Sequence, residues 1–175
     1  MFKAIGGIIV VLVAGLLLYA TTKPDAFRVQ RTALIKAPPE KIFPLINDFK
    51  QWGAWSPWEK KDPTMQRTFG ATTSGPGAKY AWNGNKNVGQ GSMEIQESAP
   101  PSKIVLKLDF VKPMEGHNVV EFTLQPVNDG TRVTWDMQGP TPYLAKIIHV
   151  FFDMDRMVGG DFETGLANLK VSAEK

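Results

Sequence analysis

Alternation of apolar and polar residues with a period of two is the feature that most constrains the fold. Residues 103–110 alternate so that Leu106 and its even-numbered neighbours share one face of an extended strand. Residues 131–137 place Trp135 on an apolar face in the same way, and residues 128–130 (Asn-Asp-Gly) predict a tight hairpin turn before them. Each such strand has one apolar face, which another part of the chain must cover.

Shorter runs broken by Gly, Pro and Asn predict further strands. The complete set of expected strands is 27–36, 65–69, 78–82, 91–97, 103–111, 118–124 and 131–137. The Pro-Pro-Glu sequence at 38–40 predicts the start of a helix, because proline fits a first helical turn and glutamate favours its positive end. From Tyr143 onward apolar residues recur at helical spacing, which predicts a long C-terminal helix that Gly159 and Gly160 kink or split. Helices on one face of an antiparallel sheet indicate an α+β fold.

The N-terminal segment differs from the rest, because residues 4–20 carry no charge. As a helix they would extend about 25 Å, the short end of a bilayer crossing. This predicts a single transmembrane helix within residues 1–22, a linker at 23–26 and one domain at 27–175. A cleaved signal peptide is the alternative, since Lys3 followed by an apolar stretch also fits that pattern.

The flanking charges leave the orientation in the membrane open. Lys3 favours an N-terminus in the cytoplasm. The opposite orientation is favoured by Lys23, Arg28, Arg31 and Lys36. The sequence therefore predicts a single-pass membrane protein whose soluble part lies on an undecided side, with a slight preference for the periplasm.

Composition excludes several classes of protein. The 175 residues include no cysteine, which rules out a disulfide scaffold, a cysteine-ligated zinc finger and a thiol nucleophile. The formal net charge of +3 is spread along the chain and does not indicate a nucleic-acid partner. The sequence contains neither the HExxH zinc motif nor a GxSxG nucleophile elbow.

Several motifs resemble those of a known family. They are Ala37–Phe43 (APPEKIF), 48–52 with 55–58, 82–85 with 88–91, 130–135, and 159–169. On these residues the chain resembles the SRPBCC or START-like superfamily, and within it the polyketide cyclase/dehydrase-like branch that carries an N-terminal membrane anchor. The resemblance covers about Phe27 to Lys170.

The resemblance implies a helix-grip fold, in which a curved seven-stranded antiparallel sheet wraps around a long C-terminal helix. It also implies a cavity between sheet and helix that holds an apolar ligand, and a location at the bacterial inner membrane. Superfamily members include lipid-transfer domains, quinone-binding proteins and aromatase/cyclase enzymes.

Candidate ligand-binding residues follow from the expected inward-facing positions. The predicted cavity lining is Tyr80, Trp82, Met93, Leu106, Leu108, Phe122, Trp135 and Phe162. A second group, Trp52, Trp55 and Trp58, has a spacing of three that places its rings on one side. These three rings either pack under the sheet edge or form a cavity rim or membrane-facing surface.

No catalytic or metal site is predicted, and neither is a cofactor. His117 and His149 are expected in structural or surface positions. The acidic pairs 153/155 and 161/163 stand two residues apart on a helix, so neither pair forms a metal clamp. For an enzyme, Glu94, Asp109 or Asp136 would be the acid or base, although alternation places the two aspartates opposite the apolar faces.

Three functional hypotheses remain open. The first is a membrane-anchored, non-catalytic binding domain for a hydrophobic small molecule or lipid, with residues 4–20 as its contact to the membrane. The second is a polyketide cyclase/dehydratase-like enzyme that uses the same cavity. The third is an interaction module whose core is packed and free of ligand. The oligomeric state is left open.

Overall fold

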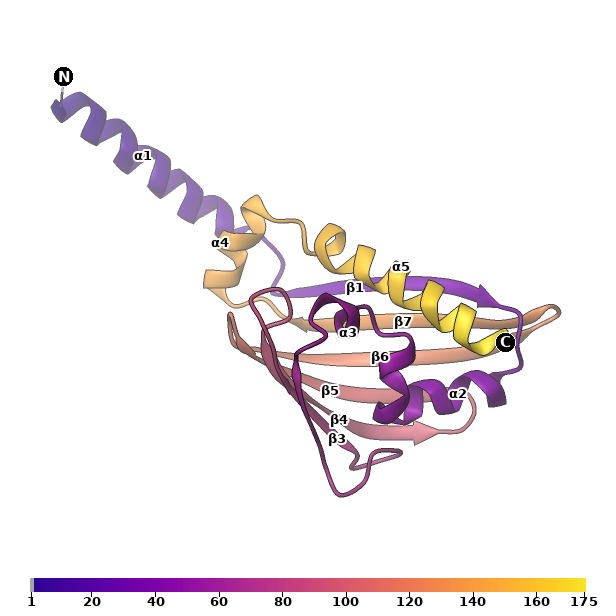
Figure 1. Ribbon diagram of the computed structural model, residues 1–175. Coiled ribbons are helices and arrows are strands. Elements are labelled where there is room, and N and C mark those ends of the chain that lie inside the picture. The colour runs from indigo at the N-terminus through magenta and orange to yellow at the C-terminus, as the bar shows by residue number, and fades with distance from the viewer. Residues whose placement is uncertain (1) are drawn as a thin grey trace.

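A curved antiparallel sheet forms the frame of the protein, and the C-terminal helix and the helices that follow the first strand lie on its concave side (Figure 1). The computed structural model describes residues 2–175. The seven strands are β1 (Ala26–Ile35), β2 (Gln66–Phe69), β3 (Lys79–Asn83), β4 (Gln90–Ala99), β5 (Lys103–Lys112), β6 (Gly116–Val127) and β7 (Gly130–Pro140). Their order in the sheet is β1-β7-β6-β5-β4-β3-β2. The predicted α+β class and helix-grip arrangement are confirmed.

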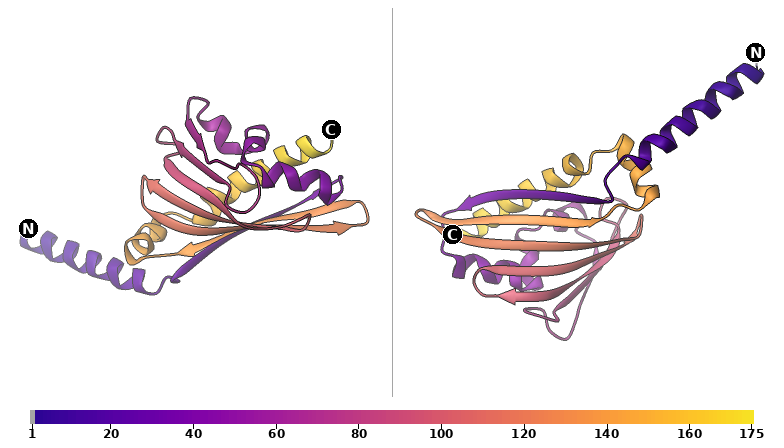
Figure 2. Two further views of the ribbon diagram at one scale, coloured as in Figure 1. Left: turned by 90° about the horizontal axis from the view of Figure 1, so that it is seen from below. Right: turned by 180° about the vertical axis from the view of Figure 1, so that it is seen from behind.

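The helices fall into three groups. The first is α1 (Phe2–Thr21), and the second comprises α2 (Pro39–Asn47), the 3-10 helix η1 (Phe49–Ala54) and α3 (Pro57–Lys61). The third group is α4 (Tyr143–Phe151) and α5 (Met154–Ala173). Figure 2 shows that α5 runs across the concave side of the sheet, whereas α1 projects away from the domain.

The strand predictions agree closely with the structure because each strand buries alternate residues. Along β7, for example, Val133, Trp135 and Met137 are buried and the residues between them are more exposed. The strand β6 begins two residues before its predicted start, β7 begins one residue before its own, and both end three residues later than predicted. At these ends the backbones of β6 and β7 stay paired beyond the residues that alternate between apolar and polar. Alternation in the sequence therefore does not show where the pairing stops.

The predicted break of the C-terminal helix at Gly159 and Gly160 is wrong. The helix breaks instead between α4 and α5, where the Asp153 carboxylate accepts hydrogen bonds from the backbone N–H groups of Asp155 and Arg156. That N-cap starts a new helix. Both glycines lie within α5, which continues through them to Ala173.

The N-terminal segment is helical, as expected, but its predicted role as a membrane-spanning anchor is not supported. Among the residues that the structure describes, no helix is long and apolar enough to cross a membrane. Met1, the first residue of the predicted 1–22 segment, lies outside the described residues.

Candidate functional site

The predicted cavity residues all lie in the core between the concave face of the sheet and the helices that cover it. Each of the eight is at most 9% exposed, and each belongs to one continuous apolar cluster. Seven come from strands β3 to β7, and Phe162 comes from α5. Alternation along the strands aims the seven inward, and the helices on the concave side cover them. The structure therefore brings the whole predicted set together, while their contact with a ligand stays a prediction.

The centre of this interior is a stack of aromatic rings. Trp135 on β7 stacks on Phe162 of α5, with ring centroids 4.1 Å apart and an interplanar angle of 9°. Phe122 lies opposite Trp135 in the register of β6 and β7, at 4.8 Å between centroids. A Cβ atom at Gly165 would stand 2.7 Å from the Trp135 ring, so only glycine lets α5 approach this closely. The interior is filled by its own side chains.

The three tryptophans of the second candidate group do not share one environment. Trp52 and Trp55 are 4% and 0% exposed, and their rings lie 4.7 Å apart beneath the helices. Trp58 is partly buried at the edge of the cluster, with centroids 5.8 Å from Trp135 and 6.3 Å from Phe162. Of the three, Trp58 alone is placed where a cavity rim would be, and the other two pack in the core.

The indole N–H groups of this interior differ in their hydrogen bonds. Trp52 Nε1 donates to the carbonyl of Ile46 at 2.9 Å, and Trp55 Nε1 donates to that of Leu45 at 2.8 Å. Trp82 Nε1 donates to Val88 in the same way. The buried Nε1 of Trp135 has no acceptor among the described residues. A buried polar group without a partner is uncommon and energetically costly, so Trp135 stands out as a candidate contact for a ligand.

Ion pairs hold α5 over the interior from two sides. Arg31 of β1 reaches Asp155 at 2.8 Å and Glu163 at 2.7 Å. On the other side Lys61 of α3 pairs with Asp161 at 2.7 Å. The Arg31 guanidinium also lowers the pKa of the Asp155 carboxyl by hydrogen bonding.

A polar cluster that the sequence did not reveal lies at the edge of the aromatic interior. The Tyr80 hydroxyl donates to Glu59 Oε1 at 2.8 Å, and Arg67 pairs with Glu59 Oε2 at 2.6 Å. Burial and the Glu59 carboxylate raise the pKa of Tyr80 above its ordinary value, so its phenol stays protonated. Glu59 and Arg67 come from α3 and β2, and no sequence pattern joins those segments.

The remaining titratable candidates lie away from this interior. Asp109 pairs with Lys107 and, at 2.7 Å, with His117, while Asp136 pairs with Arg28. These aspartates lie on the convex face of the sheet, as alternation predicts.

Glu94 also lies on the convex face, 3.6 Å from Lys79. His149 is partly buried against Phe27, and burial lowers its pKa. Within the described residues, no group of three His, Cys, Asp or Glu side chains could hold a metal ion.

Two hollows in the described structure lie on its surface. One, of about 450 Å³, is lined by Leu34 and residues 126–129 near the β6–β7 turn. The other, of about 320 Å³, lies over β2, β3 and β4 and includes Trp82 and Val111. Neither lies between the sheet and α5.

Solved structures show the same fold at low sequence identity. A protein from Chromobacterium violaceum is 16% identical, with a TM-score of 0.62 and coverage of 87% of this chain and 99% of that one. The Aha1 dimer from Colwellia psychrerythraea is 16% identical, with a TM-score of 0.57 and coverage of 85% and 96%. DynU16, from the dynemicin biosynthetic locus, is 14% identical, with a TM-score of 0.58 and coverage of 87% and 48%. These likenesses concern the fold alone.

A search of the curated proteins finds no match. The family model described as "Polyketide cyclase / dehydrase and lipid transport" matches residues 26–174. This match covers β1 through α5, including the whole aromatic interior. The chain therefore belongs to the polyketide cyclase/dehydrase and lipid transport family, within the SRPBCC superfamily.

Proposed function

We propose that this protein is a non-catalytic binding domain for a hydrophobic small molecule or lipid, held between the concave face of the sheet and α5. The observation that carries the proposal is the unpaired Nε1–H of Trp135, a buried donor in an otherwise apolar aromatic interior. A ligand with an apolar body and one acceptor atom would satisfy this donor. The family, whose description includes lipid transport, supports the same class of ligand.

Binding requires the interior to open, because its side chains fill it. The contact between α3 and α5 is the part of the interior that should open most easily. There Trp58 is only partly buried against Trp135, and one ion pair, Lys61–Asp161, joins the two helices. The other side of α5 is held more firmly, since Arg31 contacts both Asp155 and Glu163. We infer that a ligand enters at the α3 side.

The test is uptake of labelled fatty acid, phospholipid or quinone by the delipidated full-length protein. Trp135→Phe keeps an aromatic ring and removes only the donor. One hydrogen bond of about 1 kcal/mol corresponds to a loss of affinity of roughly fivefold. Trp52→Phe is the matched control, because its indole donor already binds Ile46 and should leave the affinity unchanged. No uptake of any of the three lipid classes would overturn the proposal.

A cyclase/dehydratase-like enzyme is the second candidate, favoured by the family description and by the Tyr80–Glu59–Arg67 cluster. Tyr80 is the residue that such an enzyme would place at the interior, as a hydrogen-bond donor and not as a proton-transfer acid, since its raised pKa keeps the proton on the phenol. Turnover of a bound polyketide that is lost in Tyr80→Phe while binding persists would establish this candidate over the first.

An interaction module with a packed core is the third candidate, favoured by the close stacking of the interior rings and by the two hollows that lie on the surface. It predicts no bound ligand under any condition. The uptake experiment therefore separates it from the first candidate.

We propose in addition that residues 4–20 associate with a lipid surface, with the bacterial inner membrane and its periplasmic side as the predicted location. The support is the exposure of apolar side chains along α1, including Val11 at 71% and Leu18 at 70%. Extraction of native membranes tests this. The protein should sediment with the membrane fraction and leave it in detergent, and recovery in the soluble fraction without detergent would contradict the proposal.

A further inference from the structure

Helix α4 exposes several large apolar side chains and buries its lysine. Lys146 is 8% exposed and forms an ion pair with Asp25, whereas Leu144 is 68% exposed and Phe151 is 66% exposed. A surface helix of a water-soluble protein has the opposite arrangement. Exposed apolar side chains continue beyond the helix at Phe152. Such a patch indicates a surface that contacts another apolar body.

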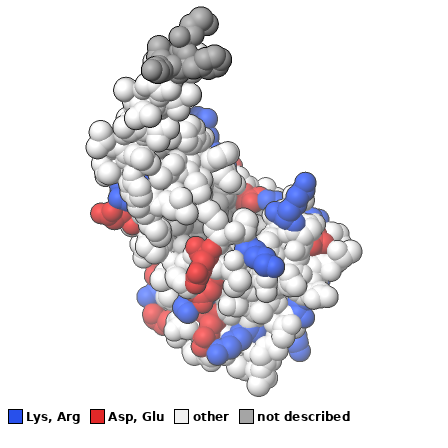
Figure 3. Space-filling view, turned by 90° about the vertical axis from the view of Figure 1, so that its left-hand side faces the viewer, with Lys and Arg blue, Asp and Glu red and all other residues white. Residues whose placement is uncertain are grey.

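This patch is continuous with α1. The helices are in contact, and the Tyr143 hydroxyl donates to the backbone carbonyl of Leu17 at 2.9 Å. Exposed apolar side chains lie along α1 from Ile5 to Tyr19, so this part of the helix has no single apolar face that one protein partner would cover. Figure 3 shows a broad surface below α1 that is free of charged side chains and bordered by them. A surrounding apolar medium fits this surface better than one docked partner.

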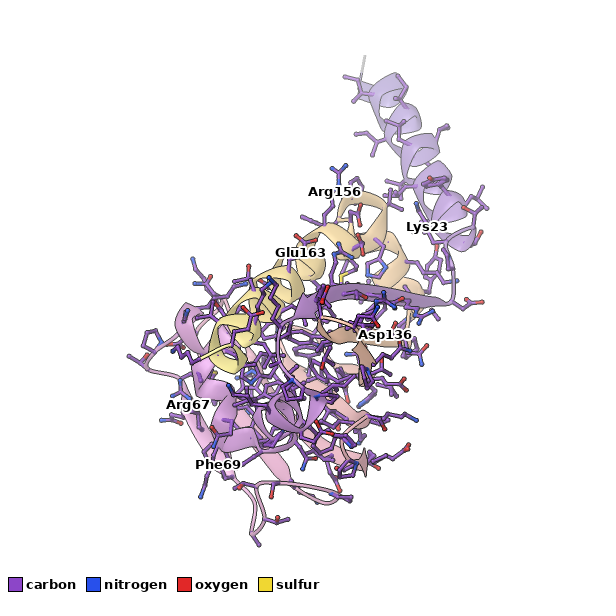
Figure 4. All side chains as sticks on the ribbon, turned by 90° about the vertical axis from the view of Figure 1, so that its right-hand side faces the viewer. Lys23, Arg67, Phe69, Asp136, Arg156 and Glu163 are labelled. Carbon is purple, nitrogen blue, oxygen red and sulfur yellow. The ribbon has the colours of Figure 1, made fainter. Side chains whose placement is uncertain are left out.

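Residues typical of a membrane–water interface stand where the patch meets the domain. Tyr19 and Tyr143 lie near the junction of α1 and α4, and the Lys23 ammonium stands 4.8 Å above the Tyr19 ring. Figure 4 shows Lys23 and Arg156 at the same end of the molecule, from the α1–β1 link and the first turn of α5. Tyrosine rings and long basic side chains favour the headgroup level of a bilayer.

We propose that α4 and Phe152 rest on a phospholipid bilayer as a second lipid contact beside α1. The inference rests on the proposed membrane association of α1. It fixes the orientation of the domain, because the β6–β7 turn then points away from the bilayer (Figure 1). It also sets the start of α5, which covers the aromatic interior, next to the lipid.

The experiment uses the full chain, whose lack of cysteine allows single-site labelling. Leu144→Cys and Phe151→Cys carry a fluorophore in vesicles of phosphatidylethanolamine and phosphatidylglycerol that contain lipids spin-labelled near the headgroup. Leu18→Cys reports on α1, and Asn128→Cys on the exposed β6–β7 turn is the distant control. We expect severalfold stronger quenching at positions 18, 144 and 151 than at 128.

Each other outcome has a definite meaning. Quenching at 18 alone would overturn the role of α4 and leave the association of α1 intact. Quenching at none of the positions would overturn both. Energy transfer between labels at position 144 of two copies, without lipid quenching, would show that a second copy covers the patch, and this too would overturn the inference. Uptake of ligand by the interior is measured separately, so its failure would not be confused with any of these.

Discussion

Helices α4 and α5 follow each other in the chain but orient their apolar side chains in opposite directions. On α5, Phe162 and Leu166 are buried against the sheet at 1% and 2% exposure. On α4, Leu144 and Phe151 face outward and Lys146 is buried. Burial of apolar side chains stabilises the packing of α5 on the domain. The exposed apolar side chains of α4 contribute little to folding stability unless another apolar surface covers them.

The difference shows that helical apolar periodicity identifies an apolar face but not what that face contacts. Both helices lie in the segment that the sequence predicts as one long C-terminal helix. The N-cap at Asp153 separates them and allows each its own orientation. One helix completes the core, and the other extends the apolar surface of α1.

The largest expected effect comes from removing a leucine side chain from α5. Leu166→Ala should lower the free energy of unfolding by about 2–5 kcal/mol, because it leaves a cavity beneath the aromatic stack. Chemical denaturation of the full chain in mild detergent measures this. A loss within about 0.5 kcal/mol would mean that α5 does not close the interior.

A smaller effect should come from the close approach of α5 to β7. Gly165→Ala places a Cβ atom 2.7 Å from the Trp135 ring and 3.2 Å from Pro57, which should cost about 1–3 kcal/mol of unfolding free energy. Gly160→Ala is the matched control on the same helix, since nothing lies within 4 Å of its added Cβ. It should stabilise the protein by about 0.5–1 kcal/mol. Equal effects of the two substitutions in denaturation would contradict the tight contact.

The ion pair between α5 and β1 should stabilise the folded protein by a small amount that depends on pH. Arg31 lowers the pKa of Asp155 below its unfolded value of about 3.9. The stabilisation is therefore present above that value and is lost as the pH falls through the lower folded pKa. Asp155→Asn should lower the denaturation midpoint slightly at pH 7. The difference from the unsubstituted protein should shrink as the pH falls below about 3.9, and a difference that grew there would contradict this account.

The smallest effect should come from the leucine of α4. Leu144→Ala removes the same atoms as Leu166→Ala but from a side chain that is 68% exposed, so the free energy of unfolding should change by less than about 0.5 kcal/mol. The same denaturation experiment measures it. A loss as large as that of Leu166→Ala would show that α4 belongs to the core, and the contrast between the helices would fail.

Much of the sheet could be predicted from the sequence, because alternation directly reflects which residues face the core. The inward position of Trp135 followed from that pattern. Its missing hydrogen-bond acceptor did not, since acceptors come from segments that only the fold brings together.

The same limit applies to Glu59 and Arg67, which meet Tyr80 from separate elements. The helix break was predicted at Gly159 and Gly160 because glycine permits a break, but it does not require one. The break occurs at Asp153, whose side chain caps the start of a new helix.

Native mass spectrometry of the full-length protein, purified in mild detergent from the cells that make it, tests the central claim most directly. Binding of an apolar molecule in the interior predicts a discrete additional mass on the unsubstituted protein, with lower occupancy in Trp135→Phe and unchanged occupancy in Trp52→Phe. A spectrum of the ligand-free chain alone, in all three proteins, would contradict the claim and favour the packed interaction module.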